Sequence, residues 1–401
     1  MNKDVKEYGL VTSAYWGFTL TDGALRMLVV LYFHQLGYSP LAVASLFLFY
    51  EFFGIVTNLF GGWLAARFGL KSTLFSGLFL QIVALILLAQ TQWLGIAYVM
   101  ALQAISGIAK DLNKMSAKTA IKQLVPADQS SRLFYWISVL TGSKNALKGL
   151  GFFLGGWLLH VVGYTGALYC LAGGLTLLTL LVGMNLTHTL QAKQYKAKFS
   201  EVFSTSPAVN WLSGARCFLF AARDVWFVVA LPVFLTLEAG WSSQLVGAMM
   251  AAWVIIYGMM QSSTPKLLGF ADHAPTGQHA LYGAIALLLV LGAMILAAQV
   301  FFDWQMVALM GLMLFAVVFA VNSAIHSFLI VHYARSEGAS MDVGFYYMAN
   351  AGGRLLGTVL SGYLYQAAGF SATIYASFVL VLVCVFISVN LPKSAMSQGT
   401  D

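Results

Sequence analysis

Nine basic residues fall within otherwise apolar stretches of this chain, and only four acidic residues accompany them there. The basic residues are Arg26, Lys110, Lys114, Lys118, Lys144, Lys148, Arg216, Arg223 and Arg354, and the acids are Asp22, Glu51, Asp111 and Asp224. A charge at the centre of a bilayer costs about 3 kcal/mol or more, so such residues are usually paired or functional. The excess of five cations, with no acid nearby, predicts a site for a small, multiply charged anion.

Two lysines four residues apart, Lys144 and Lys148, share one face near the middle of a single apolar stretch. Like charges at that spacing repel each other in the empty protein, which favours anion binding over a structural role. Lys148 and Arg354 occupy matching places in an internal repeat. They are therefore expected to hold the two ends of a dianion, because Arg suits bidentate capture of a tetrahedral oxyanion and Lys acts as a point charge.

For the remaining arginines the sequence offers different partners and positions. Asp22 and Arg26 are four residues apart with the acid first, which favours an intrahelical ion pair; the alternative is that Arg26 exchanges Asp22 for substrate. Arg223 and Asp224 are adjacent and point about 100° apart on a helix, so they are not expected to pair, and Arg223 is expected to face the substrate. Arg216 lies nearer the cytoplasmic end and is expected to snorkel.

A stripe of three lysines runs along one predicted helix. Lys110 and Lys114 are deep enough to line a cavity, with Asp111 three residues before Lys114, whereas Lys118 lies near the cytoplasmic mouth and would steer anions inward. The sequence thus proposes seven substrate-binding residues: Arg26, Lys110, Lys114, Lys144, Lys148, Arg223 and Arg354.

Five residues are candidates for proton coupling or ion pairing: Asp22, Glu51, Asp111, Asp224 and His326. Glu51 has no obvious local cation, so it is equally well a buried proton carrier or the partner of a cation on helix four or helix eleven. His326 is either a group that titrates near neutral pH or a hydrogen-bonded core residue.

Composition places these residues in a membrane. The chain of 401 residues is 60% hydrophobic and 9% charged, whereas soluble domains carry roughly 25% charged residues. Apolar stretches of about 20 residues recur with short breaks. They predict an all-α integral membrane protein with twelve transmembrane helices at roughly 9–34, 40–66, 71–91, 94–121, 132–159, 165–186, 208–237, 243–264, 279–299, 305–333, 342–366 and 370–391.

Other chemistries have little support in the sequence. The net charge of +7 comes without a basic run in a soluble module, so nucleic-acid binding is not expected. The three cysteines lie in different apolar stretches without metal-ligand spacing, and no Walker motif is present, so neither a metal nor another cofactor is expected.

Charge in the loops predicts topology. Twelve of the 21 basic residues fall in short loops or termini on one side, so both termini are expected to be cytoplasmic. The longest internal polar stretch, 187–207, is interpreted as a cytoplasmic linker between two pseudo-symmetric six-helix bundles, 1–186 and 208–401.

An internal repeat supports two related halves. At a constant offset of 206, Lys148 corresponds to Arg354, and the matched glycines are Gly151 with Gly357, Gly156 with Gly362, and Gly163 with Gly369.

The segment after the second predicted helix reads Gly62-Trp-Leu-Ala-Ala66-Arg67-Phe-Gly69-Leu-Lys71. It resembles the conformational loop motif of the major facilitator superfamily, in which Ala66 replaces the usual acid. The resemblance implies a secondary transporter, not an enzyme, that works by alternating access. The Arg and Gly-Pro motifs of drug–proton antiporters are missing from helices four and five, which disfavours a drug pump.

Longer runs resemble the organoarsenical efflux permeases of bacterial arsenate-resistance operons. They are Tyr15-Trp-Gly-Phe-Thr-Leu-Thr-Asp22-Gly-Ala-Leu-Arg26, Ser106-Gly-Ile-Ala-Lys110-Asp111-Leu-Asn-Lys114-Met-Ser-Ala-Lys118, Thr141-Gly-Ser-Lys144-Asn-Ala-Leu-Lys148-Gly149 and Ala222-Arg223-Asp224-Val-Trp-Phe-Val-Val229. This resemblance implies export of 1-arseno-3-phosphoglycerate, made by a glyceraldehyde-3-phosphate dehydrogenase that uses arsenate, through the bacterial inner membrane by a monomer. The alternatives are a sugar-phosphate or organophosphate exchanger and a proton-coupled multidrug exporter.

Overall fold

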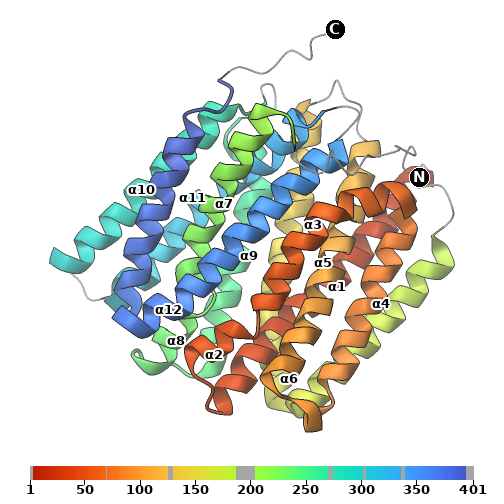
Figure 1. Ribbon diagram of the computed structural model, residues 1–401, viewed down its shortest axis with the longest axis horizontal. Helices are drawn as coiled ribbons and strands as arrows, with labels where there is room; N and C mark the ends of the chain where they lie inside the picture. Colours follow the sequence, from red (N-terminus) through yellow and green to blue (C-terminus); the bar gives the residue numbers. More distant parts are fainter. Residues whose placement is uncertain are drawn as a thin grey trace.

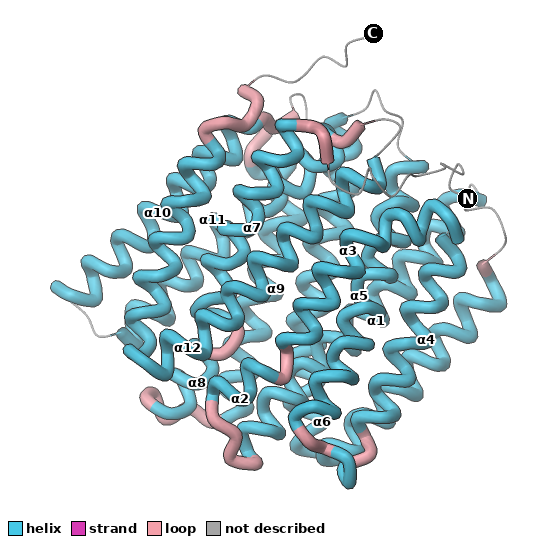
Figure 2. The backbone as a smooth tube through the Cα atoms, viewed as in Figure 1, coloured by secondary structure: helices cyan, strands magenta, loops and turns pink. Residues whose placement is uncertain are grey.

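The computed structural model describes residues 3–68, 70–124, 130–186, 204–269, 274–300, 304–335 and 339–393. Every regular element in these residues is helical (Figure 2). The first six labelled helices are α1 (Lys3–Gln35), α2 (Pro40–Ser45), α3 (Leu48–Phe68), α4 (Leu70–Leu88), α5 (Ile96–Leu124) and α6 (Ser130–Asn185). The others are α7 (Pro207–Phe227), α8 (Ala230–Leu237), α9 (Ser243–Leu267), α10 (Gly277–Val300), α11 (Trp304–Tyr333) and α12 (Ala339–Ser388), and a 3₁₀ turn spans Thr91–Trp93.

These helices form twelve spans among the described residues. α2 with α3, and α7 with α8, each make one interrupted span, whereas α6 and α12 each contain two. By length and composition eight described stretches suit a membrane, and two of them, Ser138–Asn185 and Met341–Ser388, have 48 residues each. At 1.5 Å per residue each of these is about 72 Å long, more than twice the bilayer core. The predicted all-α membrane fold is confirmed.

Both double-length helices turn at a glycine of the repeat. Gly163 in α6 has φ 71° and Gly369 in α12 has φ 74°. Glycine takes positive φ without the penalty that a Cβ would bring. These two residues stand at the offset of 206, so the two halves of the sequence change direction at equivalent residues.

The helices of the two sequence halves gather on separate sides of the molecule (Figure 1). The start of α1 and the end of α12 lie at the same face. Within each side one helix pair packs very closely, α1 with α6 and α7 with α12. The two sides meet where α3 contacts α12 and where α6 contacts α9. The predicted linker 187–207 lies mostly outside the described residues, so the domain boundaries remain a prediction.

Small residues permit the close packing in both pairs. A Cβ on Gly151 would meet the carbonyl oxygen of Leu20, and a Cβ on Gly357 would meet that of Ala221. Such backbone approach is how membrane helices gain contact in the absence of a hydrophobic driving force. The equivalent contacts bring Lys148 next to α1 and Arg354 next to α7.

We predict that Gly353→Ala destabilises the protein by about 1–3 kcal/mol, because a Cβ there would collide with the backbone carbonyl of Cys217 on α7. The neighbouring Gly352 has open space around its Cα. Gly352→Ala is therefore the matched control and is expected to unfold at or above the parent temperature, since alanine favours the helix. Thermal unfolding in detergent measures both variants. Equal unfolding temperatures for the two would contradict the packing described here.

Candidate functional site

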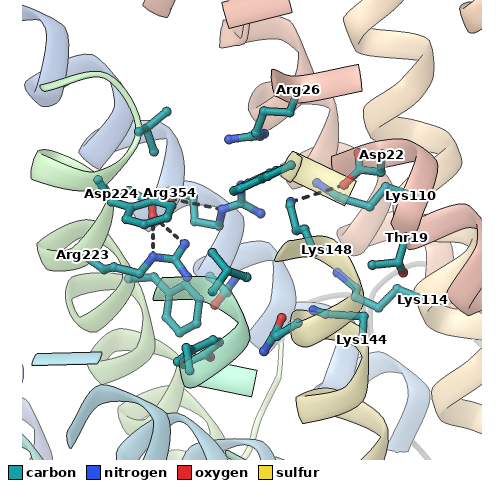
Figure 3. Close-up of a pocket in the computed structure, with 18 of the residues that line it drawn as sticks. Thr19, Asp22, Arg26, Lys110, Lys114, Lys144, Lys148, Arg223, Asp224 and Arg354 are labelled. Carbon is teal, nitrogen blue, oxygen red and sulfur yellow. Dashed lines mark hydrogen bonds and ion pairs between the residues drawn. The ribbon is translucent and has the colours of Figure 1, made fainter. Parts of the chain in front are cut away.

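A cavity of about 160 Å³ lies at the centre of the molecule, between the two groups of helices. Its lining includes eight basic and three acidic side chains, many of them visible in Figure 3. All seven substrate-binding residues proposed from the sequence line it, namely Arg26, Lys110, Lys114, Lys144, Lys148, Arg223 and Arg354. Tertiary packing thus brings together residues that come from α1, α5, α6, α7 and α12.

The predicted intrahelical pair of Asp22 and Arg26 does not form. Asp22 instead pairs with Lys148, with 3.3 Å between Oδ2 and Nζ, and accepts a hydrogen bond of 2.6 Å from the Tyr50 hydroxyl. Arg26 donates to Glu51 on α3 at 2.9 Å. The close packing of α1 against α6 and the approach of α3 offer both side chains partners on other helices, which the spacing within α1 could not reveal.

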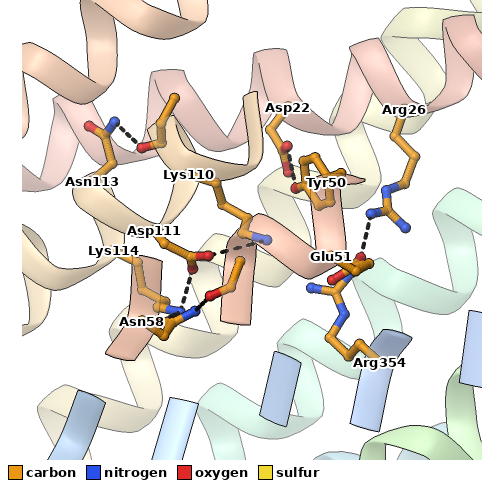
Figure 4. Close-up of polar contacts among 12 residues, drawn as sticks. Asp22, Arg26, Tyr50, Glu51, Asn58, Lys110, Asp111, Asn113, Lys114 and Arg354 are labelled. Carbon is orange, nitrogen blue, oxygen red and sulfur yellow. Dashed lines mark hydrogen bonds and ion pairs between the residues drawn. The ribbon is translucent and has the colours of Figure 1, made fainter. Parts of the chain in front are cut away.

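The lysines of α5 share one carboxylate (Figure 4). Lys114 Nζ lies 2.6 Å from Asp111 Oδ1 and also donates to Asn58 Oδ1 at 2.6 Å. Lys110 Nζ is 3.7 Å from Asp111 Oδ2 and sits over the Tyr50 ring, 4.1 Å from its centroid. Both lysines line the cavity as expected. The side chain of Lys118 lies outside the described residues.

On the opposite wall, Asp224 pairs with two arginines (Figure 3). Arg223 Nε donates to Asp224 Oδ1 at 2.6 Å, and Arg354 Nε donates to Oδ2 at 3.2 Å. The expectation that Arg223 and Asp224 would not pair was wrong, because the long arginine side chain reaches around the helix to its neighbour. The pair Asp224–Arg354 joins α7 to α12 just as Asp22–Lys148 joins α1 to α6.

Glu51 has two cationic partners rather than none. Its Oε1 accepts hydrogen bonds from Nη2 of Arg26 and, at 2.5 Å, from Nη2 of Arg354 (Figure 4). Of the two alternatives for Glu51, the ion pair with a cation of the eleventh span is the one the structure forms. Glu51 is fully buried and is not among the residues that line the cavity.

The sequence overestimated how many cations lack an acid nearby. Six of the cations whose side chains are described have an acidic partner, because each carboxylate serves more than one base or bridges two helices. Lys144 and Arg216 have no acidic partner among the described residues. The Arg216 guanidinium does not snorkel; it is buried and donates to Asn350 Oδ1 at 2.9 Å and to Ser323.

Lys144 has the most unusual surroundings. Within the described part of the chain its ammonium group has no hydrogen-bond or ion-pair partner, and it is drawn in Figure 3 without a contact. The charged groups that act on it most strongly are basic: Lys148, Lys114, Arg354 and Arg216. A partly buried ammonium close to other cations favours a counter-charge, and the described residues supply no acidic partner for it.

The two remaining candidates from the sequence are His326 and the conformational loop motif, and neither lines this cavity in the described structure. His326 is fully buried on α11, and neither ring nitrogen has a hydrogen-bond partner in the described structure, so it is neither a cavity residue nor a hydrogen-bonded core residue. In the conformational motif, the side chains of Gly62–Arg67 and all of Gly69 lie outside the described residues. Lys71 Nζ donates to the Leu186 carbonyl at 3.0 Å.

The sequence reasoning missed the neutral residues that complete the site. Asn58 and Asn350 accept hydrogen bonds from Lys114 and Arg216, and Tyr347 lies under Lys114 with its ring centroid 4.4 Å from Nζ. An amide within an apolar helix was the available signal for the two asparagines. The tyrosine carried none, because tyrosine is common in membrane helices.

Comparison with known proteins identifies the family. No curated protein matches the chain closely enough to serve as a relative. Residues 11–341 match the family model of the Major Facilitator Superfamily, which covers well over half of the chain. The twelve-span helical fold and the central cavity agree with that match. The chain therefore belongs to the major facilitator superfamily and is a secondary transporter, not an enzyme, that carries a small molecule across a lipid bilayer.

Proposed function

We propose that the protein exports a small organic anion that carries several negative charges. The observation that carries this proposal is the charge of the cavity. Eight basic side chains line it, and the carboxylates Asp22, Asp111, Asp224 and Glu51 offset four of them. A formal excess of four positive charges remains in a largely buried site, where each interaction between charges is stronger than in bulk water. A polyanion is the ligand that balances such a site.

The two walls of the cavity differ in chemistry, which supports a ligand with two anionic groups. The basic residues that α5 and α6 contribute are all lysines, Lys110, Lys114, Lys144 and Lys148, whereas those that α7 and α12 contribute are all arginines, and α1 adds Arg26. Arginine forks bind tetrahedral oxyanions bidentately, and lysines act as compact charges. An anionic group at each end of the ligand would satisfy both walls.

Among such ligands the proposal names 1-arseno-3-phosphoglycerate, and hence a role in arsenate resistance together with the dehydrogenase that makes this compound. Its arsenate and phosphate groups are each dianionic when fully ionised, which matches the excess of four charges. The sequence runs that resemble organoarsenical permeases contain six of the eight cavity cations, all except Arg216 and Arg354.

Orientation and energetics are compatible with export. In a bacterial inner membrane with both termini cytoplasmic, as the loop charges predict, an anion leaving the cell moves down the electrical gradient. Each charge gains about 2.3 kcal/mol per 100 mV. Uniport is therefore sufficient, and the cavity carboxylates, which are all engaged with cations, are not required to carry protons.

Everted vesicles test the proposal. Vesicles that contain the protein are supplied with labelled arsenate, glyceraldehyde 3-phosphate, NAD and the dehydrogenase, and label is expected to accumulate only when all components are present. Accumulation should be lost in Lys148→Gln. Uptake of 3-phosphoglycerate or a sugar phosphate in exchange for phosphate, without uptake of the arsenical, would replace the named cargo by an organophosphate. Uptake of a cationic drug alone would contradict the anion site itself.

A further inference from the structure

Glu51 lies behind the cavity wall and touches both sides of the molecule. Its Oε1 accepts from Arg26 on α1 at 2.9 Å and from Arg354 on α12 at 2.5 Å. Among the ion pairs of the described cavity cations, only Arg354–Glu51 joins a residue of α1–α6 to a residue of α7–α12. Glu51 itself is fully buried and does not face the cavity.

We propose that Glu51 is a positioning residue that ties Arg354 to Arg26 across the two sides of the transporter, and that this tether controls when α3 and α12 separate. The effect of a ligand on the tether rests on the anion site proposed above, whereas the tether in the empty protein does not.

The backbone around Glu51 shows why the tether is sensitive to movement. Gly54, one turn further along α3, would place a Cβ 3.8 Å from the Cβ of Ala351, which lies one turn before Arg354 on α12. Alternating access moves the two groups of helices as nearly rigid bodies around a central site. A shift of a few ångströms between α3 and α12 would therefore break the contact between Glu51 and Arg354, and the tether favours the arrangement seen here.

Some polar atoms of the tether lack hydrogen-bond partners among the described residues. Glu51 Oε2 and Arg26 Nε are buried without hydrogen-bond partners among the described residues, while one oxygen serves both guanidinium groups. Both arginines also line the cavity. An oxyanion bound on the cavity side would offset their charge and weaken their attraction to Glu51. Anion binding would thus loosen the contact between the two sides, which links loading of the site to movement.

A cysteine pair measures the tether directly. In a background without the three native cysteines, Gly54→Cys and Ala351→Cys have the Cβ separation of a disulfide. Oxidative cross-linking in vesicles without ligand is compared in the parent, Glu51→Gln, Arg354→Gln and the double variant. Glu51→Gln is expected to slow cross-linking on the order of tenfold, the scale of a typical coupling between sites. The double variant should be no slower than either single variant, because both remove the same contact.

Asp342→Asn is the matched control. Asp342 is also a buried carboxylate, and it pairs with Arg335 at 3.0 Å, with both residues in the second half of the chain. Loss of that pair should leave the cross-linking rate unchanged. Hydrogen exchange in the protein with its native cysteines provides a readout that does not depend on the engineered pair. Glu51→Gln should speed exchange in α3 and in the first part of α12 relative to Asp342→Asn.

Cross-linking measured with and without added anions distinguishes an error in the proposed tether from an error in the proposed anion transport. Inorganic phosphate and 3-phosphoglycerate should slow cross-linking in the parent and have no further effect in Glu51→Gln. An unchanged rate and unchanged exchange in Glu51→Gln would overturn the tether. A slower rate in Glu51→Gln with no response of the parent to either anion would support the tether and contradict the anion cargo. Uptake that depends on an imposed pH gradient, and loses that dependence in Glu51→Gln, would make Glu51 a proton carrier and overturn its positioning role.

Discussion

Replacement of Lys144 by methionine is expected to stabilise the empty protein while it abolishes high-affinity anion binding. The Lys144 ammonium has no hydrogen-bond or ion-pair partner in the described structure, and the charges that act on it most strongly are positive. Methionine keeps an unbranched stem of similar length and removes both the desolvation cost and the repulsion. Replacement of buried ion pairs by apolar groups of similar size can stabilise proteins by about 1–4 kcal/mol, and for this partly buried lysine an increase toward the lower end of that range in the free energy of unfolding is expected.

The same substitution should weaken anion binding about 10- to 100-fold, because a hydrogen bond to a charged group contributes about 1.5–3 kcal/mol. Thermal unfolding in detergent and equilibrium binding of 3-phosphoglycerate measure the two effects on one preparation. Opposite signs for stability and affinity distinguish a ligand-binding lysine from a structural one.

Lys266→Met provides the control for Lys144→Met. Lys266 lies in the last turn of α9, outside the cavity, with its ammonium 6.0 Å from the Tyr135 ring centroid. The control removes one positive charge from the protein without altering the site, so anion affinity should stay within about twofold of the parent, a difference of roughly 0.4 kcal/mol. A loss of stability in Lys144→Met, or equal affinity losses in the two variants, would contradict the interpretation of Lys144.

Arg354→Gln is expected to have the largest destabilising effect of the cavity variants. Its guanidinium pairs with both Glu51 and Asp224, whose side chains are fully buried and which each have one other arginine partner, Arg26 and Arg223. Removal of one member of a buried ion pair costs about 3–5 kcal/mol when the remaining charge has no other partner, and a loss toward the lower end of that range is expected because Arg26 and Arg223 remain. Transport should fall below detection, since the variant also removes the arginine fork of the α12 wall.

A second substitution separates the two roles of Arg354. Glu51→Gln together with Arg354→Gln also removes one of the two carboxylates that lost this partner, so part of the lost stability should return while anion transport stays absent. Thermal unfolding and vesicle uptake of the two variants give the comparison. If the double variant is no more stable than Arg354→Gln, the destabilisation by Arg354→Gln does not come from loss of the Glu51–Arg354 pair. If it transports anions, Arg354 does not contact the cargo.

Much of the fold could be predicted because membrane helices must satisfy their own backbone hydrogen bonds. Apolar length alone located the spans, and the repeat at an offset of 206 placed Gly163 and Gly369, both of which turn the chain. The interruptions between Ser45 and Leu48 and between Phe227 and Ala230 were not predicted. Their residues are as apolar as the helices around them, so composition gives no sign of a break.

For the site, the sequence determined which residue types would meet. A cation within an apolar helix must face a partner, a cavity or a ligand, since lipid cannot solvate it, and the basic residues proposed on this ground do line one cavity. Partner choice could not be predicted, because it depends on distances between helices. Spacing within α1 suggested an ion pair between Asp22 and Arg26. In the packed structure Asp22 pairs with Lys148 instead, and Arg26 pairs with Glu51.

The sequence by itself therefore determined the membrane fold, its repeat and the positive character of its centre, because these follow from hydrophobicity and charge along the chain. Only the tertiary structure decided how four carboxylates are shared among the cations, and that Lys144 has none among the residues that the structure describes. The physical reason is that ion pairing acts over 3 to 4 Å, a scale set by how helices far apart in sequence pack against one another.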